Sequence, residues 1–289
     1  MNRGNSYDDK GQHDLAIDDY NETIQFNPDN AEAYGDRGLA YFYKGQYDPA
    51  IADYTKSLQL DPNDAIIYSD RGLAYDDKGQ YGLAIADYNK ALQMNPNNVG
   101  NYNNRGWVYM EKGEFGKAIA DYGKALELDP KNSNAYANLG EAYEALGQYG
   151  KAISYYKKAI GLNDTNEYSR IWIVNSSKHI SRSLAARYMK DLPAYVASHP
   201  SDKWARTVSQ YYLGYVTEKG LLKEADGNKV HICQAYYYVG EETLWRGNRA
   251  ASKRAFAKSL STGETGQDEY IFSKIMLGKL SSGRVKPVK

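Results

Sequence analysis

The sequence predicts an all-α fold, a right-handed solenoid built from repeated pairs of antiparallel helices. Three features of its spacing lead to this prediction. A glycine recurs every 34 residues, a second glycine follows it after seven residues, and an alanine follows it after twelve. A period of this length is typical of architectures in which each repeat is one supersecondary unit. The aligned residues are Gly4, Gly38, Gly72, Gly106 and Gly140, then Gly11, Gly45, Gly79, Gly113 and Gly147, and then Ala16, Ala50, Ala84, Ala118 and Ala152.

Prolines end four of these units, at Pro28, Pro62, Pro96 and Pro130. The order aromatic, Gly, Tyr, Gly, Ala, aromatic, Pro within 34 residues resembles the tetratricopeptide repeat, which implies two antiparallel helices per unit. An array over residues 1–166 is therefore expected. It consists of a truncated unit at 1–30 and complete units at 31–64, 65–98, 99–132 and 133–166.

The small residues have a physical role in this pattern. Gly72 lies inside a predicted first helix, where glycine costs about 1 kcal/mol relative to alanine. We expect Gly72 and Ala84 to let the two helices of the unit approach closely, so that packing offsets this cost. Gly79 fits a left-handed cap at the end of the first helix. Asp48 and Pro49 predict an N-cap followed by a first-turn proline.

The repeated positions also predict side-chain contacts. The large positions of one unit hold Tyr34, Tyr41, Tyr47 and Tyr54, so the many tyrosines of the chain are expected to pack between helices. An arginine in four units is followed sixteen residues later by an aspartate, and both change together in the unit with Leu139 and Tyr155. This predicts a structural ion pair within each unit, joining Arg3 to Asp19, Arg37 to Asp53, Arg71 to Asp87 and Arg105 to Asp121.

The period stops near residue 164, and a second region follows over 167–280. Residues 167–230 are expected to form irregular helices. A degenerate repeat is predicted at 233–266, a capping helix at 268–280 and a disordered tail at 281–289.

A set of aromatic and small residues stands out in this second region. The set consists of Trp204, Tyr212 to Gly214, Cys233 to Ala235, Tyr237 to Gly240, and Gly247 with Phe256. On these residues the region resembles the C-terminal half of bacterial lipoproteins of the new-lipoprotein-I type, although Ala205 stands where that family has a proline. The resemblance implies an adaptor that docks other proteins, and it would place the chain in the bacterial periplasm if an upstream signal or lipid anchor preceded it, with the cytoplasm as the alternative.

No pattern of catalytic residues is present. The sequence has no phosphate-binding loop, no zinc-protease motif, no nucleophile elbow and no paired-cysteine metal spacing. His231 and Cys233 are two residues apart, so on a helix they point in different directions and do not form a nucleophile–base pair. We expect no enzymatic activity, no cofactor and no metal site. No apolar run reaches the roughly 18 residues needed to span a membrane.

Charge divides the chain into unlike halves. Residues 1–166 carry 16 Lys and Arg against 25 Asp and Glu, whereas residues 167–289 carry 20 against 11. The inner surface of such a solenoid is lined mainly by first helices. The predicted inward positions are the second, fifth, sixth, ninth, twelfth and thirteenth of each repeat. They hold Asn2, Asn5, Asp8 and Asp9, then Glu32, Asp36, Leu39, Phe42 and Tyr43, then Asp70, Leu73, Asp76 and Asp77, then Asn103, Asn104, Trp107, Met110 and Glu111, and finally Asn138, Glu141 and Glu144.

None of these residues is basic. The pattern predicts an acidic groove with an apolar patch, which favours a basic or amphipathic peptide as partner. It disfavours nucleic acid and any ligand that is recognised by its carboxylate. Asn104 and Asn138 occupy a position that resembles the amide ladder of the O-linked N-acetylglucosamine transferase repeats, and the likeness implies contacts to a peptide backbone.

Two alternative functions remain open at this point. The basic half could dock on the acidic array of another copy, giving a homodimer that weakens with salt. The basic half could instead contact an anionic membrane surface or RNA, although only Lys253 and Arg254 form a tight basic cluster. The primary hypothesis is therefore a protein-interaction scaffold that binds a peptide in its groove.

Overall fold

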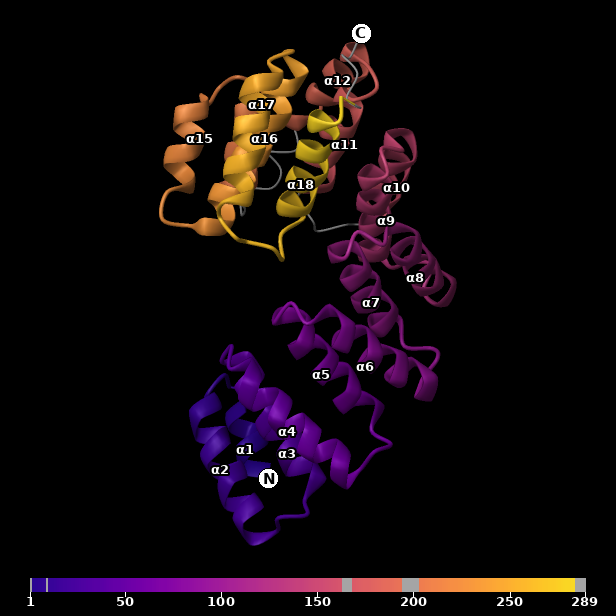
Figure 1. Cartoon of the computed structure of the whole chain (residues 1–289), viewed down its shortest axis with the longest axis vertical. Coiled ribbons are helices and arrows are strands. Elements are labelled where there is room, and N and C mark those ends of the chain that lie inside the picture. Colours follow the sequence, from indigo (N-terminus) through magenta and orange to yellow (C-terminus); the bar gives the residue numbers. More distant parts are fainter. Residues whose placement is uncertain (1, 9, 163–167, 194–202, 284–289) are drawn as a thin grey trace. The chain divides into compact units, whose positions relative to one another are not determined.

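The computed structural model describes residues 2–8, 10–162, 168–193 and 203–283, with the side chains of residues 2, 3, 5 and 168 excepted. The regular elements in these ranges are α-helices, as the sequence predicts (Figure 1). In the repeat array they are α1 (Asn2–Asp8), α2 (His13–Phe26), α3 (Ala31–Tyr43), α4 (Tyr47–Leu60), α5 (Ala65–Asp77), α6 (Tyr81–Met94), α7 (Val99–Glu111), α8 (Phe115–Leu128), α9 (Ser133–Ala145) and α10 (Tyr149–Gly161). Beyond the array they are α11 (Tyr168–Lys178), α12 (Arg182–Met189), α14 (Lys203–Tyr212), α15 (Glu218–Ala225), α16 (Lys229–Trp245), α17 (Arg249–Leu260) and α18 (Asp268–Ser281).

The chain forms two compact units. The N-terminal unit contains Met1–Lys112 with Glu127–Asp129, and the C-terminal unit contains Gly113–Leu126 with Pro130–Lys289. The division falls inside the repeat at 99–132, whose first helix α7 and most of whose second helix α8 belong to different units. Each unit is therefore a packing body of its own.

Helix pairs form the N-terminal unit in the predicted register. α1 packs on α2, α3 on α4, and α5 on α6, and each second helix also contacts the first helix of the next repeat. The glycines between the two helices of a pair adopt the left-handed conformation that the sequence predicts, with φ of 69° at both Gly45 and Gly79. This backbone conformation is strained for residues that carry a Cβ, which explains the glycine at this position.

The glycine inside each first helix lies against an aromatic ring of the second helix. A Cβ added at Gly38 would lie 2.8 Å from Cε1 of Tyr54, whose side chain is fully buried. The same contact recurs in the C-terminal unit, where a Cβ at Gly140 would lie 2.5 Å from Tyr156. The expectation that the small glycine and alanine let the two helices approach closely is therefore incomplete, because the space beside the glycine is occupied by the tyrosine ring.

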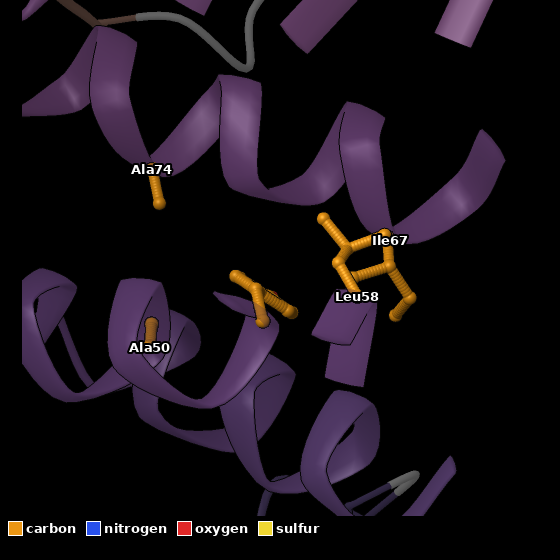
Figure 2. Packing of buried hydrophobic residues seen from close by; sticks show 5 residues of the cluster. Ala50, Leu58, Ile67 and Ala74 are labelled. Carbon is orange, nitrogen blue, oxygen red and sulfur yellow. The ribbon is translucent and has the colours of Figure 1, made fainter. Parts of the chain in front are cut away.

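Successive repeats are joined by small apolar clusters. Between α4 and α5, Ala50 and Leu58 face Ile67 and Ala74 across the gap between the two helices (Figure 2). Tyr54 belongs to the same cluster, so one ring contributes both to the contact within its repeat and to the contact with the next. The core of the N-terminal unit is thus a series of linked clusters rather than one central layer.

The predicted ion pairs within a repeat are confirmed for two repeats, 31–64 and 65–98. Nε and Nη2 of Arg37 donate to the two carboxylate oxygens of Asp53, both at 2.7 Å. Arg71 binds Asp87 in the same bidentate way, at 2.7 and 2.9 Å. The side chain of Arg3 lies outside the described residues, and the pair of Arg105 and Asp121 is divided between the two units.

The predicted N-cap at Asp48 is wrong. α4 begins two residues earlier than predicted, at Tyr47, with Gln46 as its N-cap residue. Asp48 instead pairs with Lys78 of the following repeat, and Asp14 pairs with Lys44 in the same way one repeat earlier. The aspartate at this position therefore links neighbouring repeats instead of capping its own helix.

In the C-terminal unit, α9 and α10 form the fifth repeat, and α11 packs on α10 and α12. α16 and α17 form a further pair, in which Gly240 lies against Phe256 as Gly140 does against Tyr156. The closing helix α18 packs on α16 and α17 and ends at Ser281, one residue into the predicted tail, whose residues 284–289 lie outside the described residues.

The prediction that Glu141 and Glu144 line an open groove is wrong. Both residues are only 4 % exposed. Oε2 of Glu144 accepts hydrogen bonds from Ser176 of α11 at 2.7 Å and from Tyr156 at 3.0 Å. Glu141 faces Asp268 of α18. Burial is the main cause that raises the pKa of Glu141 well above the usual range, and the charge of Asp268 is the second. Helices that follow the array therefore cover these two carboxyl groups.

Replacing Gly38 with alanine should destabilise the N-terminal unit, because the new Cβ would collide with the buried Tyr54 ring. Overpacking of this kind costs about 1–3 kcal/mol, which exceeds the roughly 1 kcal/mol that alanine gains in helix propensity. Gly82→Ala is the matched control, since no atom lies within 4 Å of its added Cβ. Urea unfolding should show a lower midpoint for Gly38→Ala only, and equal midpoints would contradict the packing argument.

The stability of the C-terminal unit should depend on the protonation of Glu144. Burial raises its pKa from 4.5 to about 7, so the folded state retains a proton that the unfolded state releases above pH 4.5. The free energy of unfolding should therefore fall as pH rises between these two values, by up to about 3 kcal/mol from this group. Glu144→Gln keeps an acceptor for Ser176 and should flatten that pH dependence. The measurement is the free energy of unfolding in urea between about pH 5 and pH 8. If it changes with pH equally in Glu144→Gln and in the unaltered chain, Glu144 is ionised in the folded protein.

Candidate functional site

The candidate site lies on the first helices of the N-terminal unit. α3 contacts α5, and α5 contacts α7, so the first helices of successive repeats lie side by side. Seven carboxylate side chains at predicted inward positions belong to these helices and to α1, and they are called the acidic row below. The acidic row consists of Asp8, Glu32, Asp36, Asp70, Asp76, Asp77 and Glu111.

Members of the acidic row are close enough to influence one another. Burial, and to a smaller extent the charges of Glu111 and Asp77, raise the pKa of Asp76 to about 7. Burial also raises the pKa of Asp70 to about 6, with a smaller effect from Asp64. Neither Asp70 nor Asp76 has a side-chain hydrogen bond or an ion pair with a described residue. These two carboxyl groups would be stabilised in their charged form by an added cation.

The residues at the thirteenth position of three repeats contact the preceding repeat. The hydroxyl of Tyr81 donates to Oε2 of Glu111 at 3.0 Å. Tyr47 has the same relation to Asp77, and it partly offsets the rise that burial causes in the pKa of that carboxyl group. In the first pair of repeats the contact is aromatic, because the rings of His13 and Tyr43 stack with centroids 5.4 Å apart. The two tyrosine contacts, each between residues 30 apart, orient the carboxyl groups of Asp77 and Glu111.

Buried tyrosines lie beneath the acidic row. Tyr54 and Tyr88 are fully buried, and burial is the main cause that raises the pKa of each hydroxyl. The charge of Asp70 adds to this for Tyr54, and the charges of Asp76 and Asp77 add to it for Tyr88. The rings that pack on the internal glycines therefore reach with their hydroxyl ends toward the acidic row.

Apolar side chains accompany the acidic row, but fewer of them are accessible than the sequence predicts. Tyr43 is 61 % exposed and Phe42 is half-buried against it, with ring centroids 5.9 Å apart. Leu39, Leu73 and Trp107 are also half-buried. Met110 is buried, so its predicted place in the exposed patch is wrong. Ile66 was missed although it occupies the second position of its repeat, and it is 70 % exposed.

The asparagines among the predicted site residues belong to both compact units. Asn103 and Asn104 are half-buried on α7 in the N-terminal unit, whereas Asn138 is half-buried on α9 in the C-terminal unit. The predicted amide ladder thus draws on both units. Asp9 and the side chain of Asn5 lie outside the described residues.

The cysteine and the histidine beside it are structural. Cys233 is buried with its Sγ 3.2 Å from Oγ of Ser259, and burial raises the pKa of the thiol. The ring of His231 stacks on Trp204 with centroids 4.5 Å apart. Among the described residues no group of three or more His, Cys, Asp or Glu could hold a metal ion, and no helix is long and apolar enough to cross a membrane.

Comparison with solved structures supports the repeat fold. The crystal structure of MamA matches with a TM-score of 0.54 and a sequence identity of 31 %, and the match covers 57 % of this chain and 96 % of the MamA chain. YrrB, described as a tetratricopeptide protein with an unusual peptide-binding site, is 21 % identical with a TM-score of 0.52, covering 58 % of this chain and 87 % of YrrB. A tetratricopeptide repeat protein from Parabacteroides merdae is 18 % identical with a TM-score of 0.61, covering 96 % of each chain. The last two show the fold alone.

Family models describe the repeats directly. A search of curated proteins found no match to the chain. The model described as TPR repeat matches residues 4–42, 38–79 and 106–147. Two models described as tetratricopeptide repeat match residues 65–98 with 133–166, and residues 87–120. These matches run without a gap over residues 4–166, and the chain belongs to the tetratricopeptide repeat family.

Proposed function

We propose that this chain is a non-catalytic scaffold whose N-terminal unit binds a basic or amphipathic peptide along the acidic row. The observation that carries the proposal is the absence of lysine and arginine from the predicted inward positions, together with carboxyl groups at Asp70 and Asp76 whose pKa values lie at about 6 and 7. A lysine or arginine of a partner would favour the ionised form of these groups. YrrB gives precedent for peptide binding by this class of repeat.

Electrostatics and aromatic contact have different roles in this proposal. The acidic row attracts a basic segment from a distance and selects it over an acidic one. Phe42, Tyr43 and Trp107 offer ring faces to aliphatic or cationic side chains once the segment has arrived. The Tyr47–Asp77 and Tyr81–Glu111 contacts hold two of the acids in place before binding, which lowers the entropy lost on association.

Removing charge from the row should weaken the binding of a basic peptide. For Asp76→Asn with Asp77→Asn we expect at least about a tenfold loss of affinity for a lysine-rich peptide, measured by fluorescence anisotropy. Asp18→Asn with Asp29→Asn removes the same charge from exposed positions of the same unit and is the matched control. Equal affinities for the two double variants would contradict the proposal.

The binding of the same peptide should also depend on pH. The carboxyl groups of Asp70 and Asp76 take up protons between about pH 7 and pH 6 in the free chain, and a proton competes with a peptide cation for each group. Affinity should therefore fall as pH is lowered through this range, and the fall should be smaller for Asp76→Asn. An affinity that is constant over this range would place the peptide away from these two residues.

The apolar contribution can be separated from charge by comparing two peptides. Phe42→Ala with Trp107→Ala should reduce affinity for an amphipathic peptide by about tenfold while changing that for a purely hydrophilic basic peptide of equal charge much less. The hydrophilic peptide also serves as the test that the variant is folded. An equal loss for both peptides would argue against a specific aromatic contact.

A further inference from the structure

The outer face of α17 is the strongest basic surface among the described helices of the C-terminal unit. The helix carries Arg249, Lys253, Arg254 and Lys258 and no acidic residue. Its other face is turned into the unit, where Ala255 is buried and Phe256 packs on Gly240. The exposed face is therefore basic because the apolar face is already used for folding.

Lys253 and Arg254 are the side chains of this face that have no partner. Both are exposed, and neither has an ion pair, side-chain hydrogen bond or ring contact with a described residue. Lys258 is one turn beyond Arg254 and lies over the Tyr236 ring, with Nζ 5.0 Å from the centroid. Residues four apart on a helix share a side, so Arg254 and Lys258 present their charges together.

Two other basic helices of this unit do not carry neighbouring cations without a partner. On α10, Lys151 lies over Tyr143 at 4.8 Å and Lys157 lies over Tyr188 at 5.0 Å, so these cations are already satisfied by rings of their own unit. On α12, Arg182 and Arg187 are exposed but five residues apart, which directs them about 140° from each other around the helix. Of these three helices, α17 alone carries exposed cations at consecutive positions, Lys253 and Arg254, that have no partner among the described residues.

We propose that this basic face of α17 binds the acidic row in the N-terminal unit of a second copy of the chain. The inference rests on the proposed function, because it fills the same row, and it names the partner. The N-terminal unit supplies the complementary charge, since residues 1–112 contain 18 Asp and Glu against 10 Lys and Arg. The small side chains of Ala250 and Ala257, both exposed on α17, leave room for another surface to approach the helix.

The contact joins unlike surfaces, which determines the assemblies it can form. Two chains that exchange the contact reciprocally would give a closed dimer, whereas a one-way contact would continue from chain to chain. In either case the cations and carboxylates are partly accessible to solvent, so association should weaken with salt. The guanidinium of Arg254 would in addition stack on an exposed ring such as Tyr43, which is 61 % exposed.

The test is the mass of the full chain in solution by light scattering, at roughly 50 mM and 500 mM salt over a range of concentrations. The mass should exceed that of the monomer at low salt and return to it at high salt. Lys253→Glu with Arg254→Glu should weaken association by at least about tenfold, as should Asp76→Asn with Asp77→Asn. The control, Arg182→Glu with Arg187→Glu, makes the same charge change on α12 and should associate like the unaltered chain.

A monomer under all conditions would overturn the inference, and so would an assembly that Lys253→Glu with Arg254→Glu leaves intact. The lysine-rich peptide separates this failure from failure of the proposed function. The Lys253→Glu, Arg254→Glu variant should still bind that peptide, because its acidic row is unaltered. A monomeric chain that binds the peptide refutes only the second copy as partner, whereas a monomeric chain that binds no peptide refutes both proposals.

Discussion

The contact between a ring of the second helix and the internal glycine of the first helix is the constraint on which the rest of the structure depends. Tyr54 can lie this close to α3 only because position 38 lacks a Cβ. The buried ring then belongs to the cluster that joins α4 to α5, and its hydroxyl end approaches the acidic row. One interaction thus sets the spacing within a repeat, the packing between repeats and the environment of the carboxyl groups that we propose for binding.

Features that recur with the period could be predicted from the sequence, because the chain provides its own comparison. The glycine at the end of each first helix and the bidentate Arg37–Asp53 pair are of this kind. Asp48 shows the limit of local patterns, since an aspartate before a proline is a good N-cap. In the structure α4 instead begins at Tyr47, and Asp48 pairs with Lys78.

The burial of Glu141 and Glu144 could not be predicted from the repeat, because the groups that cover them come from outside it. Ser176 lies on α11 and Asp268 on α18, and neither sequence keeps the 34-residue period. A carboxylate that is inward-facing by position therefore becomes part of the core of the C-terminal unit. The accessible carboxylates of the candidate site are accordingly confined to the N-terminal unit, where the acidic row and its aromatic neighbours belong to one packing body.

The most direct test of the account is to map a bound lysine-rich peptide by nuclear magnetic resonance of the labelled chain. The account predicts that resonances of the first helices change on binding, with the largest shifts for the Trp107 indole and for amides near Asp76 and Asp77. Shifts confined to the second helices α4 and α6, or to the C-terminal unit, would contradict it.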